Sequence, residues 1–266
     1  MALDLFALGP AHRSRAGKLN AGTKLLATFL LSIGLLLIKD WGTALVVFAL
    51  ELALLKAWGV QPFALLARFW PLLIGTLLTG WSTSLIADKT GETVLQVGFI
   101  WITTDSLAMG ISLMVRGLAL ILPSLLLITT TDPTHLGDSL AQTAKLPARF
   151  VLAALAALRL LGLMFSEWHT LGQARRARGL GASDSLLRRV RTLAGQTFAL
   201  LVQAIRRGTR LAVTMEARGF GAGPRTWARV PVYSRDDVTF LLCCLGTLII
   251  GYVTSGLTGT LTWVWQ

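Results

Sequence analysis

Charged side chains are scarce in this sequence. Of its 266 residues, 14% are Asp, Glu, Lys or Arg and 54% are hydrophobic, and the mean hydropathy is +0.65. Soluble domains carry about a quarter charged residues, so this composition excludes an ordinary soluble domain. Apolar runs that approach the roughly 20 residues needed to cross a bilayer recur along the chain. The sequence therefore predicts a polytopic membrane protein of the all-α class.

Residues that commonly bind metals or nucleotides are also few. The only cysteines, Cys243 and Cys244, are adjacent within an apolar run, which favours packing or lipid contact over a disulfide or a metal pair. The three histidines, His12, His135 and His169, lie far apart and lack metal-ligand spacing. No Gly-x-x-x-x-Gly-Lys-Ser/Thr loop occurs, so we expect this chain to bind no ATP in that way.

Five apolar segments predict about five transmembrane helices. They cover residues of about 20–38, 41–57, 69–87, 107–130 and 238–264. Almost no loop separates the first two, which predicts a tight helical hairpin. The sequence Thr-Asp-Pro at 131–133 predicts a helix stop followed by a new start. A short apolar stretch at 94–102 is compatible with a re-entrant or interfacial piece, or with part of an extra span.

Acidic residues are the rarer of the two charge types, with 13 Asp and Glu against 25 Lys and Arg. Residues 132–237 hold 16 of the 25 basic residues, yet apolar residues remain dense between them. This pattern is typical of long amphipathic helices on a membrane surface. Because basic segments stay in the cytoplasm, we expect a membrane domain at 1–131 with a cytoplasmic N-terminus, a cytoplasmic helical domain at 132–237 and a final transmembrane helix at 238–266.

A short peptide within the basic region is repeated. Ala-Arg-Gly-Leu-Gly-Ala at 177–182 returns as Ala-Arg-Gly-Phe-Gly-Ala at 217–222, and each copy follows a long helix-prone stretch. Helices often end at a glycine in the left-handed conformation, so coincidence is one interpretation. A six-residue match in the same context favours a duplicated functional element instead. We call residues 177–179 the first Ala-Arg-Gly motif and residues 217–219 the second.

These motifs resemble those of the transmembrane T component of energy-coupling factor transporters, the group that includes membrane subunits of cobalt and biotin uptake systems. The resemblance covers nearly the whole chain. The paired motifs are its specific part. The other matching pieces are Ala-Gly-Thr-Lys-Leu at 21–25, Thr-Thr-Asp-Pro at 130–133, Leu-Pro at 146–147, Arg159, Arg-Thr at 225–226 and Asp-Asp at 236–237.

The resemblance implies a non-enzymatic coupling subunit of a prokaryotic plasma-membrane importer of a vitamin or transition-metal ion. Each motif would dock one of two cytoplasmic ABC ATPase subunits through Arg178 or Arg218; ATP and Mg would belong to those ATPases, and this chain would bind no cofactor. The docking residues would be Ala177, Arg178, Gly179, Ala217, Arg218 and Gly219. A substrate-binding membrane protein, the S component, would lie on an apolar platform that includes Leu155, Leu158, Leu160, Leu200 and Leu201. Ordinary helix packing is the alternative role for these leucines.

Two other classes of function compete with this interpretation. An integral-membrane enzyme acting on lipid phosphates would need an acidic metal site. Asp236 and Asp237 have no second acidic cluster to complete one, so they fit a helix N-terminal cap better. A basic membrane-anchored module could bind nucleic acid or anionic lipid through residues 175–235, but its arginines alternate with many apolar residues, and we expect no nucleic-acid partner.

Four further charged residues are candidates for ion pairs. Glu51 and Arg116 fall within presumed spans, where ionisable residues often have a function. The sequence leaves two interpretations open: Glu51 and Arg116 pair with each other, or they lie near the membrane interfaces. Glu167 and Glu216 are expected to pair with neighbouring arginines.

Overall fold

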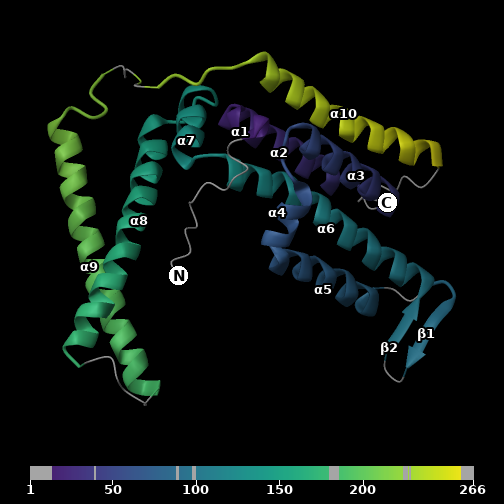
Figure 1. The fold of residues 1–266 in the computed structure, drawn as a ribbon, viewed down its shortest axis with the longest axis horizontal. Coiled ribbons are helices and arrows are strands. Elements are labelled where there is room, and N and C mark those ends of the chain that lie inside the picture. The colour runs from purple at the N-terminus through teal and green to yellow at the C-terminus, as the bar shows by residue number, and fades with distance from the viewer. Residues whose placement is uncertain are drawn as a thin grey trace. The chain divides into compact units, whose positions relative to one another are not determined.

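The computed structural model describes residues 14–38, 40–87, 90–97, 100–179, 186–223, 227 and 229–258. The chain divides into two compact units, which are described separately (Figure 1). Unit 1 comprises Met1–Ser139 and Pro231–Gln266, and unit 2 comprises Leu140–Val230. The described residues form ten helices and two short strands, so the prediction of an all-α protein is confirmed.

Unit 1 contains the five segments predicted to span the membrane, together with shorter helices. Its helices are α1 (Arg15–Lys18), α2 (Ala21–Leu36), α3 (Trp41–Ala57), α4 (Pro62–Arg68), α5 (Trp70–Ile86), α6 (Thr104–Thr130), most of α7 (Pro133–Gln142) and α10 (Arg235–Thr258). The predicted stop at 131–133 is confirmed, since α6 ends at Thr130 and α7 begins at Pro133. The predicted end of the last span, residues 259–264, lies outside the described residues.

Several described helices reach the length and hydropathy of a membrane span. These are α6, α10 over Arg235–Leu257, and α8 (Ala148–Ala177) of unit 2. The pair α3 and α4, bent by 107° at a short break, qualifies as a fourth, whereas α2 is apolar but shorter. The prediction of a polytopic membrane protein is therefore confirmed. The predicted spans at 20–38 and 69–87 correspond to α2 and α5, which have 16 and 17 residues.

The described residues of the apolar stretch, 94–97 and 100–102, belong to two paired strands. Strands β1 (Thr93–Val97) and β2 (Ile100–Thr103) pair antiparallel, and Thr103 then caps the start of α6. A strand needs about 9–11 residues to cross a bilayer, so these strands of 5 and 4 residues do not add a span.

The core of unit 1 lies where α2, α3, α6 and α10 meet. Its buried apolar side chains include Leu31, Leu55, Leu122, Leu126 and Phe240. The ring of Phe240 lies edge-on to that of Trp58, with 5.2 Å between their centroids. Because these residues come from segments far apart in the sequence, the core fixes the first half of the chain against its last helix.

A close contact between backbones joins α5 to α6. A Cβ atom on Gly110 would lie 2.5 Å from the carbonyl oxygen of Gly80 and would also overlap the hydroxyl of Ser84. Small residues permit such close approach in membrane proteins, where tight packing replaces the hydrophobic effect between helices. Gly110 is therefore a packing requirement of unit 1.

We expect the substitution Gly110→Ala to destabilise the protein, because the added methyl group forces α5 and α6 apart. Overpacking of this kind costs about 1–3 kcal/mol. Gly75→Ala in α5 is the matched control, since a Cβ there meets nothing within 4 Å. Thermal unfolding in detergent, followed by tryptophan fluorescence, measures both variants. Equal melting temperatures for the two variants would contradict the proposed contact.

Candidate functional site: two capped helix ends

Two long helices form unit 2, namely α8 and α9 (Leu186–Ala217). Three contacts hold them together: the ion pair of Arg207 with Glu167, a hydrogen bond from the Gln196 side chain to the Trp168 carbonyl at 2.6 Å, and one from Arg175 to the Thr192 carbonyl at 2.6 Å. The predicted pairing of Glu167 with an arginine is thereby confirmed. Within the described part of the chain, Glu216 forms no salt bridge.

The two Ala-Arg-Gly motifs have the same backbone geometry. In each, Ala is the last helical residue and Arg occupies the C-cap position. The following glycine has a left-handed φ, +73° at Gly179 and +72° at Gly219, and its N–H donates to the carbonyl three residues earlier at 2.9 Å in both motifs. This arrangement is the glycine C-cap of the Schellman motif. The sequence repeat is therefore also a structural repeat.

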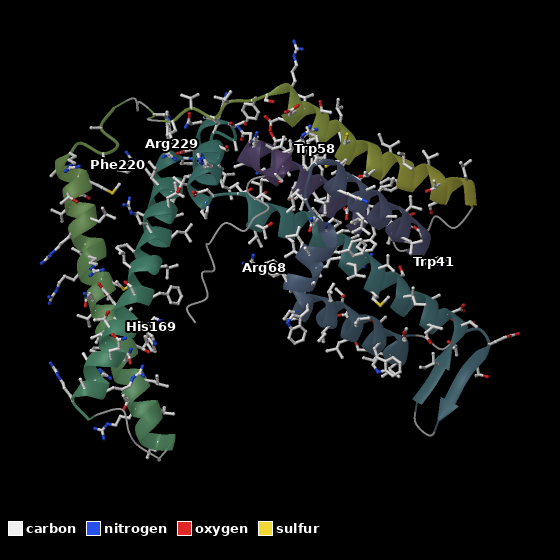
Figure 2. The ribbon with its side chains drawn as sticks, in the orientation of Figure 1. Trp41, Trp58, Arg68, His169, Phe220 and Arg229 are labelled. Carbon is white, nitrogen blue, oxygen red and sulfur yellow. The ribbon has the colours of Figure 1, made fainter. Side chains whose placement is uncertain are left out.

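The second motif shows the complete form of this cap. The N–H of Phe220 donates to the carbonyl of Met215 at 3.0 Å, which is the second hydrogen bond of the Schellman motif. Phe220 is half-buried beyond the end of α9 (Figure 2). Residues 180–182, which complete the repeat in the first motif, lie outside the described residues.

The motifs lie at opposite ends of the α8–α9 pair. Near the start of α8, Arg149 donates to the carbonyl of Gly221 at 3.1 Å, just after the second motif. The first motif ends the same helix after 30 residues, which corresponds to about 45 Å of helix length. A hollow of about 830 Å³ lies beside the second motif, lined by residues of α8 and by Arg218, Gly219 and Phe220. One pair of packed helices thus presents two separate copies of the motif.

All six residues of the two motifs are exposed. A Cβ atom on Gly179 or Gly219 would meet nothing within 4 Å, so the backbone at each motif is open. Neither Arg178 nor Arg218 forms an ion pair with a described residue. Each guanidinium is therefore a charged group available to another molecule.

The leucines predicted to form the S-component platform differ in exposure. Leu200 is buried at 9%, whereas its neighbour Leu201 is 55% exposed. Leu158 is exposed at 37%, and Leu155 and Leu160 are half-buried. Leu200 thus lies inside unit 2, while Leu158 and Leu201 leave apolar surface uncovered.

Much more apolar surface is exposed on the two helices. On α8, Phe150 is 77% exposed and Phe165 is 56% exposed; on α9, Phe198 is 67% exposed and Ile205 is 61% exposed. An apolar surface of this extent marks contact with lipid or with another protein. The arginines of α9 are interleaved with this surface.

The charged candidates of unit 1 do not pair with each other. Arg116 donates to the carbonyl of Ile38 at 2.7 Å. Glu51 is buried at 3% exposure, and neither carboxylate oxygen has a hydrogen-bond partner among the described residues. Of the interpretations that the sequence left open, the pairing of Glu51 with Arg116 is therefore wrong, because Arg116 bonds to a backbone carbonyl instead.

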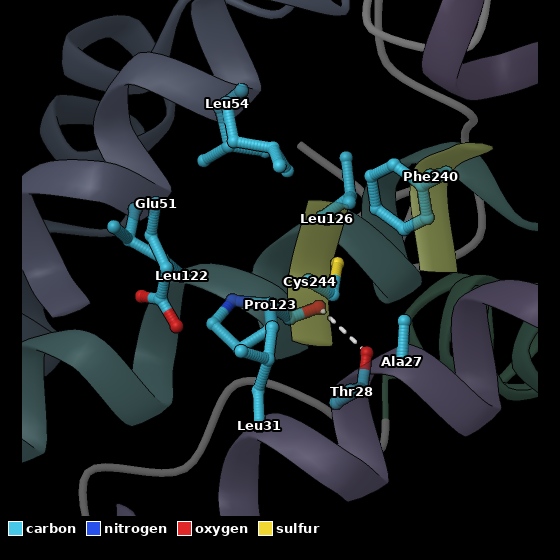
Figure 3. A pocket seen from close by; sticks show the side chains of 11 residues that line it. Ala27, Thr28, Leu31, Glu51, Leu54, Leu122, Pro123, Leu126, Phe240 and Cys244 are labelled. Carbon is cyan, nitrogen blue, oxygen red and sulfur yellow. Dashed lines mark hydrogen bonds between the residues drawn. The ribbon is translucent and has the colours of Figure 1, made fainter. Parts of the chain in front are cut away.

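A small cavity lies beside Glu51, between α2, α3, α6 and α10 (Figure 3). Its volume is about 20 Å³, and its lining includes Thr28, Leu122 and Cys244. The Thr28 hydroxyl there donates to the Pro123 carbonyl at 3.2 Å. A water molecule needs at least roughly 10–15 Å³, so this cavity has room for about one water and does not accommodate a vitamin.

Asp236 and Asp237 lie in the first turn of α10, in keeping with a role at the helix N-terminus. The carboxylate of Asp237 accepts from the backbone N–H of Ser234 at 2.8 Å and from that of Asn20 at 2.7 Å. Among the described residues, no group of three His, Cys, Asp or Glu side chains could hold a metal ion. Asp237 therefore has a structural role within unit 1.

The sequence alone assigned no role to Asn20 or Lys24, although Lys24 belongs to the Ala-Gly-Thr-Lys-Leu peptide at 21–25 that carries part of the family resemblance. Lys24 is buried at 2% exposure and donates to the carbonyls of Gly17 and Thr130 at 3.2 and 3.1 Å. The signal in the sequence was an asparagine just before an apolar helix and a lysine in the first turn of that helix.

Unit 1 is a set of packed apolar helices, and unit 2 is a basic pair of helices with two exposed arginines, each followed by a capping glycine. These features define a membrane protein with a surface suited to contact with other proteins. The CbiQ family model, described as cobalt transport protein, matches residues 12–227. The chain therefore belongs to this family, whose members are non-catalytic transmembrane components of transporters. The predictions of family and of a non-enzymatic role are confirmed.

Curated relatives carry the name energy-coupling factor transporter transmembrane protein EcfT. The chain is 28% identical over 250 residues to the protein of Leuconostoc gelidum subsp. gasicomitatum, covering 89% of this chain and 91% of the relative. It is 29% identical over 260 residues to that of Heliobacterium modesticaldum, with 91% of each covered. The Bacillus subtilis protein is 29% identical over 190 residues, covering 68% of this chain and 72% of the relative.

Proposed function

We propose that this chain is the coupling subunit of an energy-coupling factor importer, in which Arg178 and Arg218 each dock one cytoplasmic ATPase subunit. The observation that carries this proposal is the pair of exposed, identically capped arginines at opposite ends of α8 and α9. A single binding surface would not need two copies of the motif. Two ATPase subunits, each with the same acceptor site, would need them.

Arginine suits this role because its guanidinium stays charged and forms a planar pair of hydrogen bonds with a carboxylate. The preceding alanine, at 177 or 217, adds little bulk, and the following glycine ends the helix without a Cβ atom. The helix end can therefore enter a narrow groove on the ATPase. Loss of one buried, hydrogen-bonded charge in such an interface costs about 2–5 kcal/mol.

Force would pass along the two helices. When ATP draws the ATPase subunits together, their docked helix ends follow, and α8 and α9 shift against each other as rigid elements. The contacts of Arg175 and Gln196 across the pair resist separation of the helices while this happens. The basic residues of unit 2 and the N-terminus would face the cytoplasm, with α8 and α9 lying along the membrane surface.

The exposed apolar surface of α8 and α9, including Leu158 and Leu201, would contact the S component or lipid. The substrate would be a vitamin or a transition-metal ion, and the cobalt transport description of the family model supports the metal ion. Substrate specificity would reside in the S component, consistent with the small size of the Glu51 cavity.

Purification from membranes in a mild detergent tests this function. We expect the tagged wild-type chain to retain two ATPase subunits with phosphate-binding loops, together with a smaller membrane protein. Mass spectrometry identifies the bound chains, and ATP hydrolysis by the complex confirms that the ATPases are active. A chain that carries no ATPase, when expressed with the ATPases of its own cell, would contradict the proposal.

A further inference from the structure

The chain leaves unit 1 after Ser139 and returns to it at Pro231. Within unit 1, both points are bonded to the same side chain, that of Asn20. Its amide oxygen accepts from the Ser139 hydroxyl at 2.9 Å, and its amide nitrogen donates to the Val232 carbonyl at 3.2 Å. One residue thus connects the segment that leads into unit 2 with the segment that leads out of it.

Asn20 is also fixed to two transmembrane helices. Its side-chain oxygen caps α2 by accepting from the N–H of Gly22 at 2.9 Å, and its own N–H donates to Asp237 in the first turn of α10 at 2.7 Å. Asparagine is among the best residues at this cap position. The two segments that reach unit 2 are therefore bonded directly to the first turns of α2 and α10.

Lys24 extends these contacts to α6. One turn beyond Asn20, its buried ammonium donates to the carbonyl of Thr130 at 3.1 Å, which ends α6 just before the chain leads to α7. A cation is favourable at a helix C-terminus. Asp237 also attracts Lys24 electrostatically. Four helices, α2, α6, α7 and α10, thus meet in one polar cluster.

We propose that Asn20 is a positioning residue for energy coupling: it joins the outgoing and returning segments so that displacements of unit 2 reach α2 and α10 together. We call Asn20, Lys24, Ser139, Val232 and Asp237 the Asn20 junction. The inference rests on the proposed function, since it assumes that the ATPases move unit 2. Without the junction, either segment could move while the transmembrane helices stayed in place.

The variant Asn20→Ser separates this role from simple capping. Serine caps a helix about as well as asparagine, so α2 keeps its N-terminal hydrogen bond. The shorter side chain cannot bridge Ser139 and Val232. Ser139→Ala removes one of the two links and provides an intermediate variant. Thr103→Ala is the control for stability. It removes the N-terminal cap of α6, and Thr130 lies at the opposite end of that helix.

The experiment uses the complete complex in nanodiscs, with a spin label on the exposed native Cys243 of α10; Cys244 is buried. The probe is ATP with Mg, and the readout is the change in label mobility on nucleotide binding. In parallel, ATPase retention is measured by co-purification. For Asn20→Ser we expect full ATPase retention, with a change in label mobility at least fivefold smaller than in the wild type. Ser139→Ala should reduce this change partly, and Thr103→Ala should leave it as in the wild type.

Three results would overturn the junction while leaving the proposed function intact. The first is a wild-type response in Asn20→Ser, and the second is no response in the wild type although the ATPases are bound. The third is an equal loss in Asn20→Ser and Thr103→Ala, which would indicate a general loss of stability. Absence of bound ATPases from the wild type would instead contradict the proposed function and the junction with it.

Discussion

Charge reversal at either motif, Arg178→Glu or Arg218→Glu, is expected to abolish ATP-driven uptake while the protein remains folded in the membrane. Both side chains are exposed and form no ion pair with a described residue, so the fold does not depend on them. Loss of about 2–5 kcal/mol at a buried charged contact weakens docking by about 30- to 4000-fold, since 1.4 kcal/mol is tenfold. Repulsion from acidic groups on the ATPase adds to this loss.

Accumulation of labelled Co²⁺, biotin or another vitamin that the wild type takes up measures transport, and co-purification measures docking. Arg210→Glu is the matched control, because Arg210 is an exposed arginine of α9 that lies before the second motif. We expect each single variant to lose one ATPase contact and the double variant to lose both subunits. Full uptake by the double variant would rule out the docking role of the motifs.

The helix ends could be predicted because the signals that end a helix are local. Glycine after Arg178 and Arg218 adopts the left-handed conformation that the repeat suggested. Proline at 133 follows the end of α6, and the two aspartates at 236–237 lie in the first turn of α10. In each case, residues within one helical turn determine the backbone, so the sequence carries the information.

The orientation of a helix around its own axis could not be predicted in the same way. Leu200 and Leu201 are identical residues, yet one is buried and the other exposed. Successive residues on a helix differ by about 100° in direction because 3.6 residues make one turn. The contacts with α8, such as that of Gln196 with the Trp168 carbonyl, decide which leucine faces inward.

Long-range polar contacts were equally inaccessible. A presumed ion pair between Glu51 and Arg116 requires knowledge of how α3 packs against α6, which no local pattern supplies. The 107° bend between α3 and α4 likewise depends on packing. Pro62 at the start of α4 is a local signal for a new helix, but it does not give the direction in which that helix continues.

Lys24 is the residue whose loss should affect the stability of unit 1 most. The substitution Lys24→Met keeps most of the apolar stem but removes the donor to Gly17 and Thr130. A hydrogen bond from a charged group contributes about 1.5–3 kcal/mol. Because the buried ammonium also loses hydration, we expect a net destabilisation of about 2–4 kcal/mol for the two bonds together.

The same substitution at an exposed lysine provides the control for Lys24→Met. Lys56 lies exposed in the last turn of α3, so Lys56→Met should leave the melting temperature nearly unchanged. Thermal unfolding in detergent and the yield of inserted protein measure both variants. Since Lys24 connects α2 to the end of α6, its loss should also increase amide exchange at residues 130–132. Similar melting temperatures for Lys24→Met and Lys56→Met would show that the buried ammonium does not stabilise the cluster.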